Sequence, residues 1–91
     1  MSKPHVGDHI SVLRDFIVDD AYSHHGIYVG KGKVIHYDND LGFLGKITHL
    51  DDPKVRETSL EEFLKGRDEY YVHLYDNHGK ETKVIKKRYS D

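Results

Sequence analysis

Apolar and polar residues alternate in several short runs along the first half of the chain, a pattern that predicts half-buried β-strands. Residues 9–13 form the first such run, and the polar stretch 14–23 after it is expected to be a loop. Residues 25–29 and 34–37 form two more runs, separated by Gly30-Lys31-Gly32-Lys33. Because glycine adopts the positive φ of tight turns at little cost, these two runs predict a β-hairpin.

The second half of the chain predicts one short helix followed by a strand. Ser59 is expected to be the N-cap of the helix, with Glu62 completing a capping box and Gly66 ending the helix. The apolar face of this helix consists of Leu60, Phe63 and Leu64. Residues 69–75 then alternate as a strand does, with Tyr70, Val72 and Leu74 on one face and Tyr71, His73 and Tyr75 on the other.

Two weaker signals complete the outline of the fold. Residues 44–50 predict a strand interrupted by Gly45, and residues 82–85 predict a last strand that pairs back on its predecessor. No internal repeat or low-complexity linker divides the chain, so residues 1–91 are expected to form a single domain. The predicted fold class is α+β, a small antiparallel meander with one short helix.

Composition narrows the class of protein further. The 91 residues are 36% hydrophobic and 33% charged, which suits one small globular domain. Fourteen Lys and Arg against sixteen Asp and Glu give a net charge of −2, which argues against binding of nucleic acid through its phosphates. No apolar stretch is long enough to span a membrane and the polar start does not resemble a signal peptide, so we expect a cytoplasmic protein.

The chain contains no cysteine and eight histidines. The absence of cysteine excludes disulfides, thiolate zinc sites and a cysteine nucleophile within these 91 residues. Histidine is the side chain suited to proton transfer near neutral pH, so candidate chemistry is sought there.

Three motifs with histidine resemble the LRAT (lecithin:retinol acyltransferase) domain family, a circularly permuted branch of the NlpC/P60 papain-like superfamily. The motifs are Gly7-Asp8-His9-Ile10, His24-His25-Gly26-Ile27-Tyr28-Val29-Gly30 and Val34-Ile35-His36-Tyr37, in the family's order over residues 7–37. The resemblance implies a small α+β domain and thiol-based acyl transfer, or amide or ester hydrolysis, through an acyl-enzyme.

The resemblance also implies roles for individual residues. His24 falls at the general-base position and His36 at the position that orients the base, an arrangement that activates a nucleophile. The family's nucleophile is the cysteine of a downstream Asn-Cys-Glu-His-Phe-like motif, which this sequence lacks. Tyr28 and Tyr37 are the candidate binding residues.

The hairpin connection decides which histidine faces His36. A three-residue loop Gly30-Lys31-Gly32, with Gly32 as the left-handed bulge residue, pairs Val29 with Lys33 and places His36 opposite Gly26, on the same face as His24. A two-residue Gly30-Lys31 turn would instead place His25 opposite His36. Spacing alone leaves both open, and the resemblance favours the first.

Alternative chemistry has less support. A zinc site of His24, His25 and His36, with His73 or Asp38, lacks the compact spacing of known zinc motifs, so no metal or other cofactor is expected. Ser23 would point away from His24 because adjacent strand residues face opposite sides, and Ser59 is better explained as the helix cap.

Two functional hypotheses follow. The first is a non-catalytic LRAT-like module that binds a protein or a small molecule. The second is the N-terminal part of a thiol acyltransferase or hydrolase, completed by a segment outside this chain. If the family's downstream helix is missing, the face that carries His24 and His36 is left uncovered, so we expect self-association or a protein partner on that face.

Overall fold

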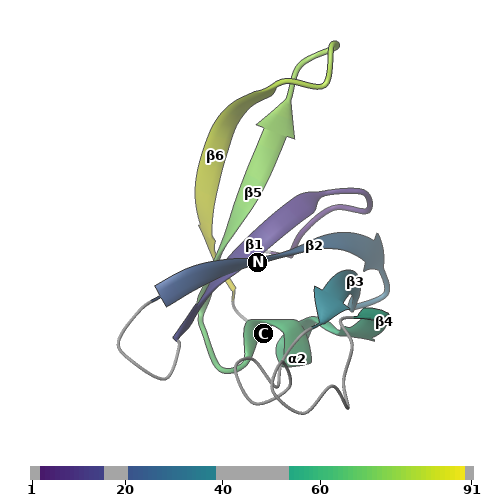
Figure 1. The fold of residues 1–91 in the computed structure, drawn as a ribbon, viewed down its shortest axis with the longest axis vertical. Coiled ribbons are helices and arrows are strands. Elements are labelled where there is room, and N and C mark those ends of the chain that lie inside the picture. The colour runs from purple at the N-terminus through teal and green to yellow at the C-terminus, as the bar shows by residue number, and fades with distance from the viewer. Residues whose placement is uncertain (1–2, 16–20, 39–53, 90–91) are drawn as a thin grey trace.

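A computed structural model describes residues 3–15, 21–38 and 54–89 (Figure 1). Within them, six strands form one antiparallel sheet in the order β4-β3-β2-β1-β5-β6. The elements are β1 (His9–Asp15), β2 (Ala21–Gly30), β3 (Lys33–Asp38), β4 (Lys54–Ser59), α2 (Leu60–Leu64), β5 (Glu69–Tyr75) and β6 (Glu81–Arg88). The predicted α+β fold, an antiparallel sheet with one short helix, is confirmed, and it is mostly β.

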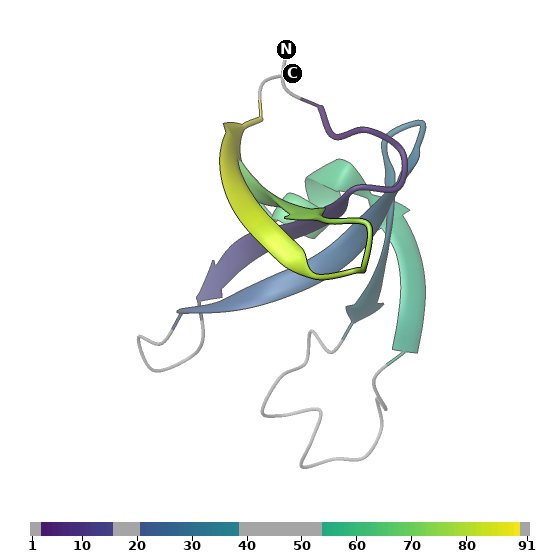
Figure 2. The same cartoon turned by 90° about the horizontal axis from the view of Figure 1, so that it is seen from above.

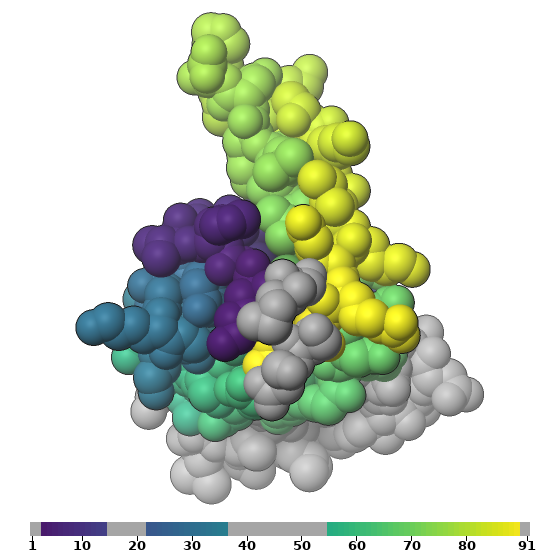
Figure 3. All heavy atoms as spheres, turned by 180° about the vertical axis from the view of Figure 1, so that it is seen from behind, coloured from purple at the N-terminus to yellow at the C-terminus, as the bar shows by residue number. Residues whose placement is uncertain are grey.

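The chain is a meander only as far as β4. Strands β2, β3 and β4 each pair with the strand before them, whereas β5, which follows α2, pairs with β1 instead of β4. Strand β1 is therefore central, between β2 and β5. The β5–β6 hairpin projects beyond the rest of the molecule (Figures 1 and 3).

Several predicted boundaries differ from the structure. Residues at both ends of the expected 14–23 loop belong to strands, because Arg14 pairs with Tyr22 across β1 and β2. The buried Arg14 side chain donates to the carbonyl of Phe63 at 2.6 Å, which holds the end of β1 against the helix. Strand β4 was not predicted, and β6 is longer than expected. The predicted strand at residues 44–50 lies outside the described residues.

The predicted helix is confirmed together with its N-cap. The Ser59 hydroxyl accepts from the backbone N–H of Glu62 at 3.0 Å, and the helix ends where Lys65 and Gly66 take φ of 48° and 86°. A helix of five residues is not stable alone, so it depends on packing. Its three apolar side chains are buried against β3 and β4.

The sheet has two different faces. The face covered by α2, which we call the helix face, carries the core of the molecule (Figure 2). Its strand residues include Ile10, Val12, Tyr28, Val34 and Tyr70, all buried. The opposite face, which we call the open face, carries the neighbouring positions of the same strands. Within the described residues, no helix is long and apolar enough to cross a membrane.

Candidate functional site

The helix face brings His24 and His36 together. His24 Nε2 lies 2.8 Å from His36 Nδ1, and His36 Nε2 lies 2.8 Å from Thr58 Oγ1 on β4. The prediction that the two histidines share one face is confirmed, because His36 pairs with Gly26 across β2 and β3.

The hairpin reaches this register by a different connection. Gly30 pairs with Lys33, and Lys31 and Gly32 form the turn with φ of 54° and 73°. The prediction that Val29 pairs with Lys33 was therefore wrong. A two-residue turn with positive φ at both positions suits the twist of a hairpin, and a β-bulge between Tyr28 and Gly30 restores the register that places His36 opposite Gly26.

Hydrogen-bond directions assign the tautomers of the pair. The Thr58 hydroxyl donates to the carbonyl of Ser59 at 3.1 Å, so it accepts from His36 Nε2. Nδ1 of His36 then carries the lone pair and accepts from Nε2 of His24. In this arrangement the lone pair of His24 lies at Nδ1.

The histidine pair lies inside the core. The exposed fractions of His24 and His36 are 9% and 4%, and the ring centroid of Phe63 from α2 lies 5.4 Å and 5.2 Å from theirs. Gly26 makes this approach possible, because a Cβ there would lie 2.9 Å from Phe63 Cε1 and 2.7 Å from Val34 Cγ1. The helix thus occupies the face on which the pair lies.

The contacts that the structure describes do not place Tyr28 or Tyr37, the two candidate binding residues, at a ligand site. Tyr28 is buried, and its hydroxyl accepts from the backbone N–H of Gly32 at 2.9 Å, which supports the hairpin turn. Tyr37 pairs with Val55 in the sheet, and its side chain lies outside the described part of the structure. Their binding roles stay predictions.

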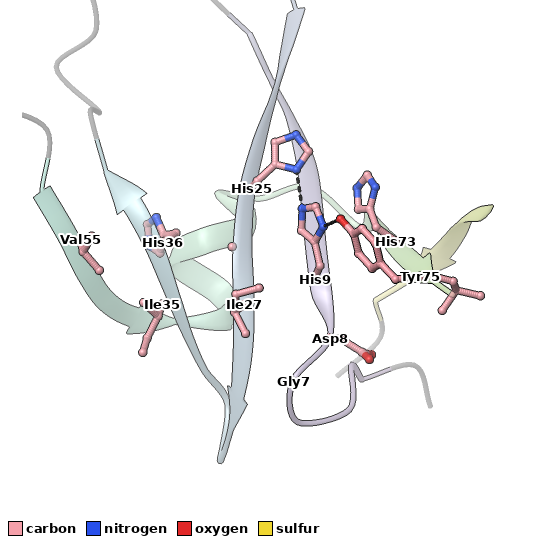
Figure 4. Close-up of a pocket in the computed structure, with 12 residues that line it drawn as sticks. Gly7, Asp8, His9, His25, Ile27, Ile35, His36, Val55, His73 and Tyr75 are labelled. Carbon is pink, nitrogen blue, oxygen red and sulfur yellow. Dashed lines mark hydrogen bonds between the residues drawn. The ribbon is translucent and has the colours of Figure 1, made fainter. Parts of the chain in front are cut away.

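The open face carries a second group of histidines, which was not predicted from the sequence (Figure 4). His9 Nε2 lies 2.8 Å from His25 Nδ1, and the His9 ring stacks on that of His73 with centroids 4.2 Å apart. One ring nitrogen from each of the three lies within 4.8 Å of the others. We call His9, His25 and His73 the open-face triad.

Oxygen atoms hold the outer nitrogens of the triad. His9 Nδ1 lies 2.5 Å from the Tyr75 hydroxyl (Figure 4), and His73 Nδ1 lies 2.8 Å from Glu81 Oε1. His73 Nε2 contacts the Ser11 hydroxyl at 2.8 Å. The His9 and His73 rings therefore each have an oxygen partner on β5 or β6.

The surroundings of His9 and His25 disfavour protonation of these two rings. Partial burial lowers the pKa of His9 and of His25, and the nearby His73 lowers both further, whereas the Glu81 carboxylate acts in the opposite direction. The shifted pKa values favour neutral imidazoles at His9 and His25 at neutral pH.

A hollow of about 720 Å³ lies on the open face beside the triad. The three histidines of the triad and Tyr75 line one side, while Ile27, Ile35 and Val55 line the other (Figure 4). His36 also borders the hollow. Val55 is 69% exposed. This is the volume range of small-molecule sites, which combine apolar walls with a few polar groups.

The sequence held a partial signal for the triad. His25 and His73 each stand one position from a core residue in their strands, so strand alternation places them on the open face. Their meeting with His9 depends on the β1–β5 pairing, in which His9 lies opposite His73. No turn connects those two strands, so local spacing did not reveal it.

These observations define a small α+β domain with a buried histidine pair that is held in one tautomer. The sequence matches the family described as Lecithin retinol acyltransferase over residues 2–89. The chain therefore belongs to the lecithin retinol acyltransferase family, as the resemblance of its motifs implied. No curated protein and no solved structure matches it.

Proposed function

We propose that this domain is a non-catalytic binding module of its family, and that the hollow on the open face binds a small molecule with an apolar body and a hydrogen-bonding head. The observation that carries the proposal is the hollow itself, which combines aliphatic and imidazole walls in a chain without cysteine.

The walls of the hollow fit the two ends of such a molecule. Ile27 and Ile35 are about two-fifths exposed and offer apolar contact at one end, on neighbouring strands in direct register. His9 and Tyr75 offer ring nitrogen and hydroxyl groups at the other end. Burial of the aliphatic surface supplies affinity, and the polar groups fix the orientation of the ligand.

The chain has no cysteine thiol for the general base of the family's chemistry to activate. A general base accelerates acyl transfer by acting on a nucleophile within hydrogen-bond reach, and the thiol is absent from these 91 residues. Among the described hydroxyls, that of Thr58 hydrogen-bonds to His36. Ser23 is exposed next to His24 in the strand, and strand alternation points its side chain to the other face. We therefore expect no acyl-enzyme from this chain.

Titration with 1-octanol, octanoate and octylamine, followed by amide NMR shifts, tests the binding proposal. These probes share an apolar body and differ in the head group. We expect saturable shifts at Ile27, Ile35 and His9 with at least one probe, and affinity at least fivefold weaker in Ile35→Gln. Val84→Gln changes an equally exposed residue outside the hollow and should leave the affinity unchanged.

Two results would overturn this proposal. The absence of saturable shifts for all three probes, or shifts confined to the helix face, would remove the binding site from the open face. A burst of acyl-enzyme with an activated ester, abolished by His24→Ala, would show that the domain is catalytic.

A second candidate is the N-terminal part of a thiol acyltransferase or hydrolase that another segment completes. The observation that favours it is the tautomer of His24, whose lone pair at Nδ1 suits a general base. Extending the coding sequence beyond Asp91 tests it. An Asn-Cys-Glu-His-like segment, with acyl-enzyme formation that requires both its cysteine and His24, would support this candidate over the binding module.

A further inference from the structure

We propose that the open-face triad of His9, His25 and His73 binds one divalent transition-metal ion of the zinc type, with the fourth coordination position directed into the hollow. The inference rests on the ring nitrogens, their partners and their place beside the hollow, and it does not depend on the proposed small-molecule ligand. It places a metal site on the face of the sheet opposite the family's histidine pair.

The distances fit a common ion after a small adjustment. Zinc binds imidazole nitrogen at about 2.0–2.1 Å, and tetrahedral geometry then places ligand nitrogens about 3.3 Å apart. The triad nitrogens lie within 4.8 Å of one another, and His9 Nε2 and His25 Nδ1 are 2.8 Å apart. Binding replaces this hydrogen bond with two metal–nitrogen bonds, and the exposed His25 ring has room to move.

The outer partners of the rings match those of metal-bound histidines. A histidine ligand commonly presents one nitrogen to the ion while its other nitrogen is held by a carboxylate, carbonyl or hydroxyl oxygen. Tyr75 holds Nδ1 of His9, and Glu81 holds Nδ1 of His73, which leaves Nε2 as the ligand atom of each. Glu81 also supplies a negative charge beside the ion.

One contact must change when the ion binds. His73 Nε2 contacts the Ser11 hydroxyl, and its ring is stacked almost parallel to that of His9, at 17°. Because imidazole binds a metal in the plane of the ring, His73 has to tilt away from Ser11 so that both Nε2 atoms face one ion. The Glu81 contact provides the pivot for this tilt.

The donor set selects the metal class. Three imidazoles without thiolate suit Zn²⁺, Co²⁺, Ni²⁺ and Cu²⁺, whereas Mg²⁺ and Ca²⁺ prefer oxygen ligands. Three protein ligands leave a fourth position for water or for the head group of a ligand, as in zinc sites that act on substrates. The polar end of the hollow, which the triad lines, is where that position lies.

Metal binding is tested on the full chain after treatment with EDTA and desalting. We expect 1:1 binding of ZnCl₂ by calorimetry and, with CoCl₂, the intense visible bands of tetrahedral cobalt. His25→Gln should weaken binding at least 50-fold, and Glu81→Ala about 10- to 100-fold. His25 and Glu81 are exposed, so both variants should keep the fold, which circular dichroism checks.

The matched control is His78→Gln, because His78 is an exposed histidine in the turn between β5 and β6 and lies outside the triad. Its affinity for Zn²⁺ should equal that of the unmodified chain. Three outcomes would overturn the proposal: no saturable 1:1 binding, binding unaffected by His25→Gln in a folded protein, or binding lost with His78→Gln. None of them bears on whether octanol or its analogues bind.

Discussion

His24 and His25 are neighbours in the chain, and their side chains lie on opposite faces of β2. His24 hydrogen-bonds to His36 beneath α2, while His25 hydrogen-bonds to His9 on the open face. Strand alternation thus separates two histidine systems with different surroundings. One is buried and held in a single tautomer, and the other lies on the open face, where the His25 ring is exposed beside the hollow.

Thr58→Val should destabilise the domain by about 1–3 kcal/mol, because it leaves the buried Nε2–H of His36 without its acceptor. The shape of the side chain is nearly conserved, so packing contributes little to the change. Urea unfolding measures the loss. Imidazole ¹⁵N shifts of His36 and His24 should also change, since the donor order along the pair is no longer imposed from Thr58.

Thr82→Val is the control for this substitution. Its hydroxyl donates to the Leu74 carbonyl at the exposed end of the β5–β6 hairpin, so the stability change should stay within about 0.5 kcal/mol. An equal loss of stability in both variants would contradict the assignment of a special role to the Thr58 hydroxyl.

Gly26→Ala should cost about 1–3 kcal/mol through overpacking. The added Cβ would meet Val34 and Phe63 at less than 3 Å, so the helix has to shift from the histidine pair. Thermal unfolding should register the loss, and the ring signals of Phe63 should move. Ser23→Ala, at an exposed position of the same strand, should be close to neutral. Retention of full stability in Gly26→Ala would show that α2 adapts freely.

Local features were predictable from the sequence because they depend on neighbouring residues. The helix cap at Ser59 is set by a side chain and a backbone group three positions apart. The facing of His24 and His36 follows from a hairpin whose strands are joined directly. The exact turn was missed, since a two-residue turn with a bulge at Val29 gives the same register at His36 as the predicted three-residue loop.

Pairing between strands that are distant in the chain could not be predicted from the sequence. Strand β4 has no strong alternation, and it forms because β3 offers an unpaired edge before the helix begins. The open-face triad requires β5 to pair with β1, across a gap of 64 positions between His9 and His73. The spacing of residues along the chain does not indicate which strand β5 pairs with.

Acid should destabilise the metal-free domain through the triad. The pKa of His9 and of His25 is lowered in the folded state, so at pH above about 6.5 both states are neutral and the effect is absent. As the pH falls below 6.5, the unfolded chain binds protons first, and the free energy of unfolding decreases until the folded-state pKa is passed. The Glu81 carboxylate and the His73 ring also face these rings.

The measurement is the free energy of unfolding of the domain in urea, between pH 7.5 and 5 and in the presence of EDTA. The double variant His9→Gln/His25→Gln should show a shallower decline over this window than the unmodified chain. His5→Gln changes a fully exposed histidine and should retain the original slope. Identical slopes in all three proteins would contradict the lowered pKa values.

Self-association through the face that carries His24 and His36, expected from the sequence, stays a prediction, and the open face is a second surface on which to test association. The helix covers His24 and His36, whereas Ile27, Ile35 and Val55 are exposed together on the open face. Burying such a patch against a second copy would favour association, and β4 lies at the edge of the sheet beside it.

We expect light scattering at micromolar concentration to give a mass that rises with concentration. Val55→Lys should restore a constant monomer mass, whereas Val6→Lys, equally exposed but outside this patch, should not. A constant monomer mass for the unmodified chain over the same range would sink the idea.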